Sequence, residues 1–478
     1  MKKQFRIASL LLAALMASQT LVACGSEAVS DNDTTTGDTT PVETEPEYLD
    51  DLGDIRFDGE TFTMFFAHPI PYYIVEEETG DVLDDAIYAR NQKVEERLGI
   101  ELELIESAWS SGGSDQTAAA TAIEQYILAG DDTNDVYIHV QHGAMPTQIA
   151  QGYFVDWNTI NNIDFSKPYW YSKCLDDINY GDKVYTMTGD YNLYTLTLLN
   201  VLFFNKRLLD EAQIEYPYQL VKDGTWTFDK FKQMVADTTR DLNGDTKIVG
   251  TDDQIGYWGW QYEQFPAMFM GMGGDSVLKS NDGTPVMNVD NERTHKIIDT
   301  MLDFFSLDGA MYEGKTYALP NDTFTSGKLA FLHTSMDFAT KLRDMEDDFG
   351  FVPYPKLDTD QETYNCRVQN TSGFTYIPIT NKDLDFTGAV LECMASISYN
   401  TTVPAFFDVA LTIKSTRDTD TEEMIPIIRE CASFNDDAIG FSPSSMITGG
   451  QALATYWASN KNNFEQKMQE LIVDVYCK

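Results

Sequence analysis

The residues that could do covalent chemistry in this sequence do not stand at the spacings of catalytic motifs. The chain has no G-x-S-x-G, no H-E-x-x-H and no G-x-x-x-x-G-K-[ST] segment. Adjacent acids occur at Glu422-Glu423 and Asp436-Asp437, but such pairs are expected where acids are abundant and are usually solvated. A glycosidase needs two opposed carboxyl groups at a set separation, which a sequence cannot demonstrate. We therefore expect neither an enzyme nor a cofactor.

One acidic segment has the residue types of a calcium loop. Asp241, Asn243 and Asp245 supply oxygen atoms at positions 1, 3 and 5, and Asp252 stands at position 12. Position 6 lacks the usual glycine, and position 12 is Asp where a bidentate Glu is usual. Two interpretations stay open, a structural calcium site and a polar turn.

The N-terminus has the pattern of an export signal. Lys2, Lys3 and Arg6 precede a short apolar stretch over 7–17, which is too short to span a bilayer. The following Leu21-Val22-Ala23-Cys24 resembles the lipobox of bacterial lipoproteins, in which the cysteine is lipidated after cleavage. We predict a signal peptide over 1–23 and a lipid, such as palmitate, on Cys24. The alternative is a secretory peptide with an incidental cysteine.

The other five cysteines are far apart and include no C-x-x-C pair; they are Cys174, Cys366, Cys393, Cys431 and Cys477. This spacing argues against a zinc or redox site. We expect scattered buried thiols, with one disulfide if the surroundings are oxidising.

The composition sets wider limits. The chain has 478 residues and a formal net charge of −43, from 76 acids and 33 bases. This acidity argues against binding nucleic acid or anionic lipid directly. Hydrophobic residues make up 43%, enough for sizeable cores. Residues 25–54 contain no Lys or Arg and few large apolar residues, so we predict a flexible acidic tether over 24–56.

The hydrophobic pattern of the body alternates between strand and helix. The segment 61–66 is β-rich, Leu83 to Leu98 has one apolar helical face, and Ile100 to Leu104 alternates as a strand. A second helix, from Ala118 to Gly130, precedes a strand over 135–140. The pattern predicts βαβ units and an α/β fold. Later helices are predicted with caps at Thr227 and Thr387, and another along the apolar stripe from Phe464 to Val475.

Several segments, in order, resemble the carbohydrate-type extracellular solute-binding proteins of ABC importers, and most closely a clostridial subgroup. They are Asp135-Val136-Tyr137 with 148–156, Phe203-Phe204-Asn205-Lys206, Asp223 to Phe228, Phe324 to Phe331, Phe349 to Lys356, and Asp241 to Asp245. The resemblance implies a type II fold in which two α/β lobes are joined by hinge strands and close on a ligand in the cleft between them. It places crossings near Thr188–Tyr191, near Phe351–Pro355 and between 410 and 435. The implied divisions are the signal peptide 1–23, the tether 24–56, lobe 1 at 57–188 and 353–420, and lobe 2 at 189–352 with most of 421–478.

The resemblance also implies where a ligand would bind. A sugar presents hydroxyl groups and apolar C–H faces, so its site needs carboxylates, amides and aromatic rings. Three segments can supply them: His139, Gln141 and His142; Asp190, Tyr191 and Asn192; and Trp258, Trp260, Tyr262 and Glu263. Each has a purely structural alternative, as a satisfied histidine, a turn-capping acid or core tryptophans. The family's sugar-stacking Trp is replaced here by Ser335-Met336-Asp337-Phe338.

The resemblance therefore implies a receptor, lipid-anchored at the outer face of the cytoplasmic membrane. It would capture a small solute, a mono- or oligosaccharide, by hinge closure and deliver it to ABC permease subunits driven by their ATPase. The alternatives are a surface-anchored carbohydrate-active enzyme and a non-transport adhesin or sensor.

Overall fold

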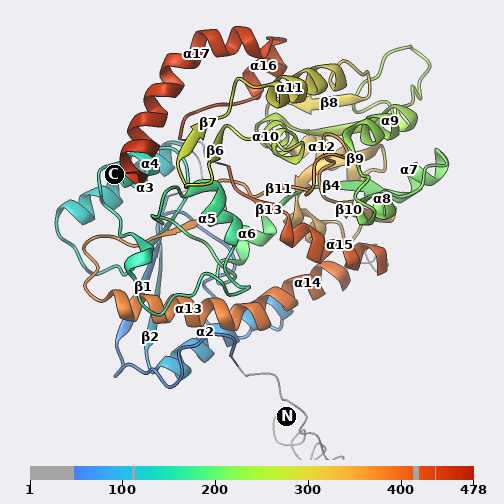
Figure 1. Ribbon diagram of the computed structural model, residues 1–478. Helices are drawn as coiled ribbons and strands as arrows, with labels where there is room; N and C mark the ends of the chain where they lie inside the picture. The colour runs from blue at the N-terminus through green and yellow to red at the C-terminus, as the bar shows by residue number, and fades with distance from the viewer. Residues whose placement is uncertain (1–47, 110–112, 413–418, 436–437, 478) are drawn as a thin grey trace, which may run out of the picture. The chain divides into compact units, whose positions relative to one another are not determined.

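Two β-sheets organise the computed structural model, which describes residues 48–109, 113–412, 419–435 and 438–477 (Figure 1). The first sheet has four strands in the order β12-β3-β1-β2. Its strands are β1 (Thr61–Phe66), β2 (Glu101–Glu106), β3 (Val136–His139) and β12 (Phe374–Tyr376). Helix α2 (Val82–Leu98) connects β1 to its parallel neighbour β2, and α3 (Gly113–Leu128) connects β2 to β3. The predicted βαβ units and α/β class are confirmed.

The second sheet has five strands in the order β10-β4-β9-β5-β8. They are β4 (Asn200–Asn205), β5 (Ile255–Trp260), β8 (Ala310–Glu313), β9 (Leu329–Ser335) and β10 (Phe349–Val352). The strands β5, β8 and β9 run parallel, whereas β4 is antiparallel to both β9 and β10. All six residues of β4 are buried, as expected of a strand with neighbours on both sides and covered faces.

The remaining elements cover these sheets or connect them. The short strands are β6 (Val277–Lys279), β7 (Pro285–Met287), β11 (Cys366–Arg367) and β13 (Ala432–Ser433). The other helices are α4 (Met145–Ala150), α5 (Ser172–Ile178), α6 (Leu193–Thr197), α7 (Lys206–Glu211), α8 (Tyr218–Lys222), α9 (Phe228–Thr238), α10 (Gln261–Gly271), α11 (Glu292–Phe304), α12 (Ala318–Thr325), α13 (Leu384–Asn400), α14 (Thr402–Thr412), α15 (Thr419–Glu430), α16 (Ser444–Gly449), α17 (Leu453–Lys467) and α18 (Asp474–Tyr476). Within the described residues, no helix is both long enough and apolar enough to span a bilayer.

The chain passes between the two sheets twice, and a third segment, 431–435, pairs with the second of these passages; these three segments are called the passages below. The first passage leaves Met187, which bridges to Thr375 of β12, and enters β4 at Asn200, within reach of the predicted Thr188–Tyr191. The second was expected near Phe351–Pro355, which is wrong: Phe351 pairs with Phe203 inside the second sheet. The chain instead crosses from β11 to β12, over 366–374. The third segment contains β13, which pairs with β11 in parallel; the crossing expected between 410 and 435 stays a prediction.

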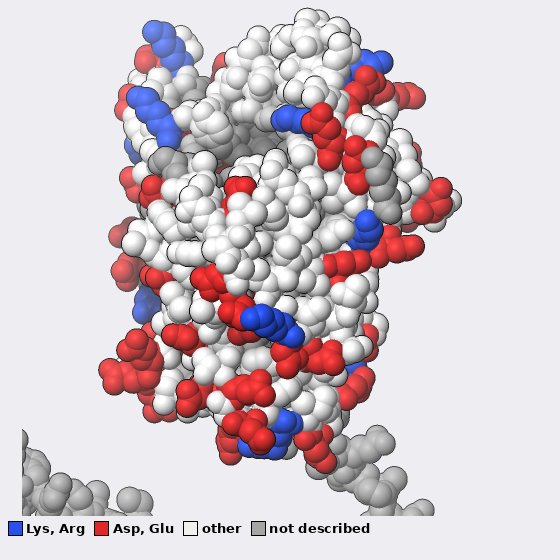
Figure 2. All heavy atoms as spheres, turned by 90° about the vertical axis from the view of Figure 1, so that its left-hand side faces the viewer, with Lys and Arg blue, Asp and Glu red and all other residues white. Residues whose placement is uncertain are grey.

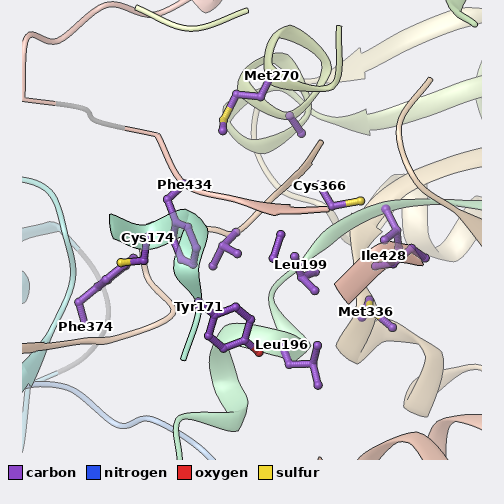
Figure 3. Packing of buried hydrophobic residues seen from close by; sticks show 14 of the residues in the cluster. Tyr171, Cys174, Leu196, Leu199, Met270, Met336, Cys366, Phe374, Ile428 and Phe434 are labelled. Carbon is purple, nitrogen blue, oxygen red and sulfur yellow. The ribbon is translucent and has the colours of Figure 1, made fainter. Parts of the chain in front are cut away.

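Apolar side chains from all three passages pack into one cluster (Figure 3). Leu199 comes from the first passage, Cys366 from the second and Phe434 from the third, and each is buried. The connecting segments therefore belong to the same continuous core as the two sheets rather than crossing as exposed linkers. This shared core fixes the registers on which the candidate site depends.

Two predicted helix starts need correction. Thr227 precedes α9 as predicted, but its side chain makes no capping hydrogen bond. The helix predicted from Thr387 begins earlier, because the side chain of Asp383 accepts the backbone N–H of Phe386 and caps α13. The C-terminal stripe is helical as predicted: α17 continues through a π-helical turn (Met468–Val473) into α18.

The predicted tether is wrong for its last residues. Asp50 is buried and forms an ion pair with Arg97, and the side chain of Leu52 is buried as well. A partner for the carboxylate and a place in the core offset the ordering entropy that favoured a flexible segment. The predicted tether residues 24–47 lie outside the described residues, as does Cys24.

Acidic side chains spread over the surface, as the composition predicts. On the face shown in Figure 2, carboxylate groups clearly outnumber the basic groups and gather in the lower half. A hollow in the upper half of the same face is bordered mainly by uncharged atoms. The excess of acid is therefore largely a solvated surface on this face.

A buried carboxylate on α13 provides a test of the first lobe's packing. Glu392 accepts hydrogen bonds from the Tyr169 hydroxyl (2.5 Å), the Trp170 indole N–H (2.9 Å) and the Asp164 backbone N–H (3.2 Å). We expect Glu392→Ala to lower the free energy of unfolding by about 3 kcal/mol, because three donors lose their acceptor. Urea denaturation measures it, and the exposed Glu96→Ala on α2 should change it by less than about 0.5 kcal/mol. Equal effects of the two substitutions would contradict the prediction.

Candidate functional site

A cavity of about 660 Å³ lies where α10 and α5 approach the segments that connect the sheets. Its volume falls within the range of small-molecule sites. Aromatic side chains supply apolar surface, namely Tyr262, Phe269, Phe434 and Phe441. Amides and charged groups supply hydrogen bonds, namely Asn365, Asn370, Asn435, Glu263, Asp177, Lys173 and Arg367. The mixture suits a ligand with both apolar faces and hydroxyl groups.

The guanidinium of Arg367 organises one side of this cavity. Arg367 lies on β11 and its side chain is 5% exposed. Its Nε donates to Asn435 (2.8 Å), Nη1 to Glu263 (2.5 Å) and Asn200 (3.3 Å), and Nη2 to Asn370 (3.1 Å). The guanidinium thereby fixes the amides and the carboxylate that line the cavity.

A second ion pair stands on the α5 side. Lys173 contacts Asp177 at 2.8 Å, one helical turn away, and the other oxygen of Asp177 accepts the backbone N–H of Phe434 at 2.9 Å. Burial raises the pKa of Asp177, while the nearby Lys173 opposes that shift. The bond to Phe434 joins α5 to the third connecting segment and orients the Phe434 ring beside the cavity.

The start of α10 brings an aromatic ring and an acid to the cavity. Trp260 is the N-cap residue, and Tyr262 and Glu263 lie in the first turn. Gly259 permits this arrangement, because a Cβ atom there would lie 2.7 Å from the Cβ of His333. The Tyr262 side chain is 56% exposed, unusually open for a large aromatic ring. Such a ring is available for stacking.

Of the predicted site residues, His142, Tyr262 and Glu263 line this cavity. His142 follows β3 and is partly exposed; burial and the nearby Arg367 charge lower its pKa. His139 lies at the end of β3 with 1% exposure, and its Nε2 is 3.2 Å from the Gln116 carbonyl oxygen. Burial, and then the neighbouring His68, lower the pKa of His139 to about 3. This ring is a neutral, buried neighbour of the site rather than part of its lining.

Three other predicted residues, Gln141, Tyr191 and Trp258, lie in the interior, and Trp260 lies at its edge. The backbone N–H of Gln141 donates to Asn370 (3.2 Å), so Gln141 supports the lining without joining it. The Tyr191 hydroxyl is 2.6 Å from the Thr375 hydroxyl. Trp258 packs over Gly250, where a Cβ atom would lie 2.2 Å from its ring. Trp260 is partly buried, in edge contact with Tyr262 at 5.3 Å between ring centroids.

Asp190 lines a different hollow of about 530 Å³, together with Trp170, Tyr171, Tyr399 and Arg429. One of its oxygens pairs with Arg429 at 2.5 Å, and the Tyr171 hydroxyl lies close enough to the carboxylate to favour its charged form. The predicted acid and the predicted aromatic segment are therefore not brought into one pocket. Burial raises the pKa of Asp190 to about 7, against the lowering effect of Arg429.

The predicted calcium segment forms a network of side-chain to backbone hydrogen bonds. Asp241 accepts from the backbone N–H groups of Gly244 (2.6 Å) and Thr246 (2.7 Å). Asn243 and Asp245 accept from residues two positions further on. The Asp252 carboxylate accepts a hydrogen bond from the Thr251 hydroxyl at 3.3 Å. In the described part of the chain, no group of three or more acidic, histidine or cysteine side chains is placed to hold a metal ion.

Sequence reasoning missed Arg367, the amides around it and the α5 ion pair. Arg367 stands between the apolar residues Cys366 and Val368 in a chain with few bases. This unusual position was the one feature of the sequence that could have indicated a buried, functional arginine. The amides gave no signal, because they come from segments far apart in sequence.

Comparison with known proteins defines the class. Residues 80–399, more than half of the chain, match the bacterial extracellular solute-binding protein family, and the chain belongs to that family. A search of curated proteins finds no significant match.

Solved structures show the same fold at low sequence identity. The chain is similar to an ABC substrate-binding protein of Listeria monocytogenes in complex with cycloalternan (15% identity, TM-score 0.52, covering 86% of this chain and 100% of that one). It is similar to the GacH receptor of Streptomyces glaucescens, solved unliganded and with acarbose (14% identity, TM-score 0.55, covering 86% of this chain and 98% of that one). It is also similar to the maltose/maltodextrin-binding domain MalE of Bdellovibrio bacteriovorus bound to maltotriose (14% identity, TM-score 0.54, covering 86% of this chain and 100% of that one). The fold is thus the type II solute-binding fold, and these relatives are binding proteins rather than enzymes.

Removal of the guanidinium tests its organising role. We expect Arg367→Met to lower the free energy of unfolding by about 3 kcal/mol, because Glu263 and the surrounding amides lose a buried donor. Chemical denaturation measures the change, and the exposed Arg343→Met is the matched control, with less than about 0.5 kcal/mol expected. A stability equal to that of the control would show that Arg367 is dispensable.

The raised pKa of Asp190 predicts a pH dependence of stability. The folded value of about 7 exceeds the ordinary 3.8, so the folded protein binds this proton more tightly than the unfolded chain. The stabilisation is fully present below about pH 4 and is lost as the pH rises through about 7. Asp190→Asn cannot titrate, so it should lose less stability than the wild type between pH 5 and pH 8 in urea denaturation. The exposed Asp299→Asn on α11 should follow the wild type; equal pH dependence in all three proteins would refute the assignment.

Proposed function

We propose that the protein is a lipid-anchored substrate-binding receptor of an ABC importer and that it captures a mono- or oligosaccharide. The observation that carries the proposal is the cavity at α10, which combines an exposed Tyr262 ring with amides, a carboxylate and an arginine already held in place. Membership of the solute-binding family and the oligosaccharides bound by proteins of the same fold support it.

The pairing of charges in the cavity favours an uncharged ligand over an anion. Arg367 is paired with Glu263, and Lys173 is paired with Asp177 and lies close to Asp275, the third acid of the lining. A charged solute would find each oppositely charged side chain already in an ion pair. A hydroxyl group can still form a hydrogen bond with such a side chain, because an ion pair leaves some of its lone pairs and N–H groups available. Sugars offer such hydroxyl groups without a net charge.

The arrangement of the connecting segments supports capture by closure. The cavity is lined by α10, next to the second sheet, by His142, next to the first, and by residues of the second and third passages. A ligand that contacts all of them would favour the arrangement in which they lie close together. Delivery to permease subunits and attachment through Cys24 complete the proposal. Their support is the family membership and the lipobox.

A ligand panel tests the substrate class. Thermal denaturation of the protein would be followed with mono-, di- and oligosaccharides, with short peptides and with metal salts. A rise in Tm with one or more sugars is expected, since a ligand that binds only the folded state stabilises it. The bound sugar should be recovered chemically unchanged. Rises with peptides or metals alone would overturn the carbohydrate assignment, and release of a hydrolysed product would overturn the binding role.

The exposed ring gives a sharper prediction. We expect Tyr262→Ala to weaken the affinity for the best sugar of the panel by about tenfold, in line with the loss of one aromatic stacking contact. Titration calorimetry measures it. Tyr312, on β8 and also partly exposed (38%), does not line the cavity, and Tyr312→Ala should leave the affinity unchanged. Equal losses in the two variants would show that the ring does not contact the ligand.

A further inference from the structure

Two thiols meet where the second and third connecting segments pair. Cys366 opens β11, and Cys431 directly precedes β13. The two strands are parallel, with Cys366 opposite Ala432, and the backbone N–H of Cys366 donates to the carbonyl oxygen of Cys431 at 2.7 Å. Both cysteines are free thiols.

This register sets the separation of the two residues. Neighbouring strands lie about 4.8 Å apart and a strand rises about 3.3 Å per residue, so the two Cα atoms are about 6 Å apart. Disulfides span Cα separations of about 4.4–6.8 Å. The influence of Cys431 on Cys366 also places the two thiols near each other: burial raises the pKa of Cys366, and the neighbouring Cys431 raises it further.

The remaining described cysteines have other surroundings. Cys174 is fully buried, Cys393 lies 3.8 Å from the Arg97 guanidinium, and Cys477 is exposed near the C-terminus. Cys366 is fully buried as well, whereas Cys431 is partly exposed. An external reagent therefore reaches this pair through Cys431.

We propose that Cys366 and Cys431 are a redox-active pair that a low-molecular-weight disulfide converts into an intramolecular disulfide. The Cys431 thiolate attacks the reagent, forming a mixed disulfide and releasing one thiol. The sulfur of Cys366 then attacks the Cys431 sulfur, and its proton passes to the departing thiolate, which leaves as the second thiol. The two protein thiols lose two protons and two electrons in total, and the reagent disulfide is reduced to two thiols.

The cross-link would join two of the three passages. Because Arg367 follows Cys366, the bond would also restrain the guanidinium that orders the cavity. It would close a long loop of the unfolded chain, which stabilises the folded state. The inference rests on the pairing of β11 with β13, on the proximity of the two thiols and on the partial exposure of Cys431, and it holds whatever the ligand proves to be.

Oxidised glutathione, added to the purified protein at pH 8, is the direct probe. Peptide mapping should show one cross-link, between Cys366 and Cys431, with the loss of two hydrogen atoms. The Tm should rise by at least about 2 °C and return on reduction with dithiothreitol. Both thiols remaining free, or a cross-link that joins other cysteines, would overturn the proposal.

Single substitutions separate the two roles. Cys366→Ser should accumulate a glutathionyl adduct on Cys431, because the second thiol is missing. Cys431→Ser should leave Cys366 unmodified, because that thiol is buried. Cys393→Ser, the matched control, should still form the cross-link and show the Tm shift. Adduct formation on Cys366 in Cys431→Ser, or none on Cys431 in Cys366→Ser, would contradict the order of the steps.

Discussion

The buried guanidinium of Arg367 is the interaction on which the connection between the sheets depends. It joins Asn200 at the start of β4, Glu263 on α10, its neighbour Asn370 and Asn435 beyond β13. A buried charge is costly unless its N–H donors have acceptors. The guanidinium is therefore stable in the interior only when all four partner side chains lie around it. The three passages are therefore coupled: movement of one changes the hydrogen bonds of the others. The cavity is lined by several members of this set, which links its shape to the arrangement of the two sheets.

Local sequence pattern was sufficient for much of the fold. The alternation around β1, α2 and β2 and the ordered family segments predicted the α/β architecture, because these elements are determined by their own periodicity. The second passage was placed too early, at Phe351–Pro355. Strands β11 and β13, which mark the passages, have only two residues each. A segment of two residues is too short to show the alternation of apolar and polar residues by which a strand is predicted. Asp50 was missed for a related reason, since its partner Arg97 lies on another element.

The candidate site was predictable where a local segment displays it. The end of a predicted strand located His142, and a cluster of aromatic residues in the sequence located Tyr262 and Glu263. Asp190 also stands on a passage, but it faces the second hollow. Gly189 packs against Trp170, where a Cβ atom would lie 2.9 Å from the ring, and Asp190 meets Arg429 from α15. That partner is distant in sequence, and a single sequence contains no information on the pairing.

The acidity of the chain and the pairing of charges around the cavity have a common physical basis. Carboxylates on the surface are solvated and mutually screened, whereas each carboxylate facing the cavity must be paired or hydrogen-bonded. Lys173 lies close to both Asp177 and Asp275, and Arg367 is paired with Glu263, so each of the three acids that line the cavity has a base beside it. The two bases offset most of the charge of the three acids. What distinguishes one ligand from another in such a cavity is then the geometry of hydrogen bonds and ring contacts, and a neutral solute rich in hydroxyl groups is the ligand that such geometry can select.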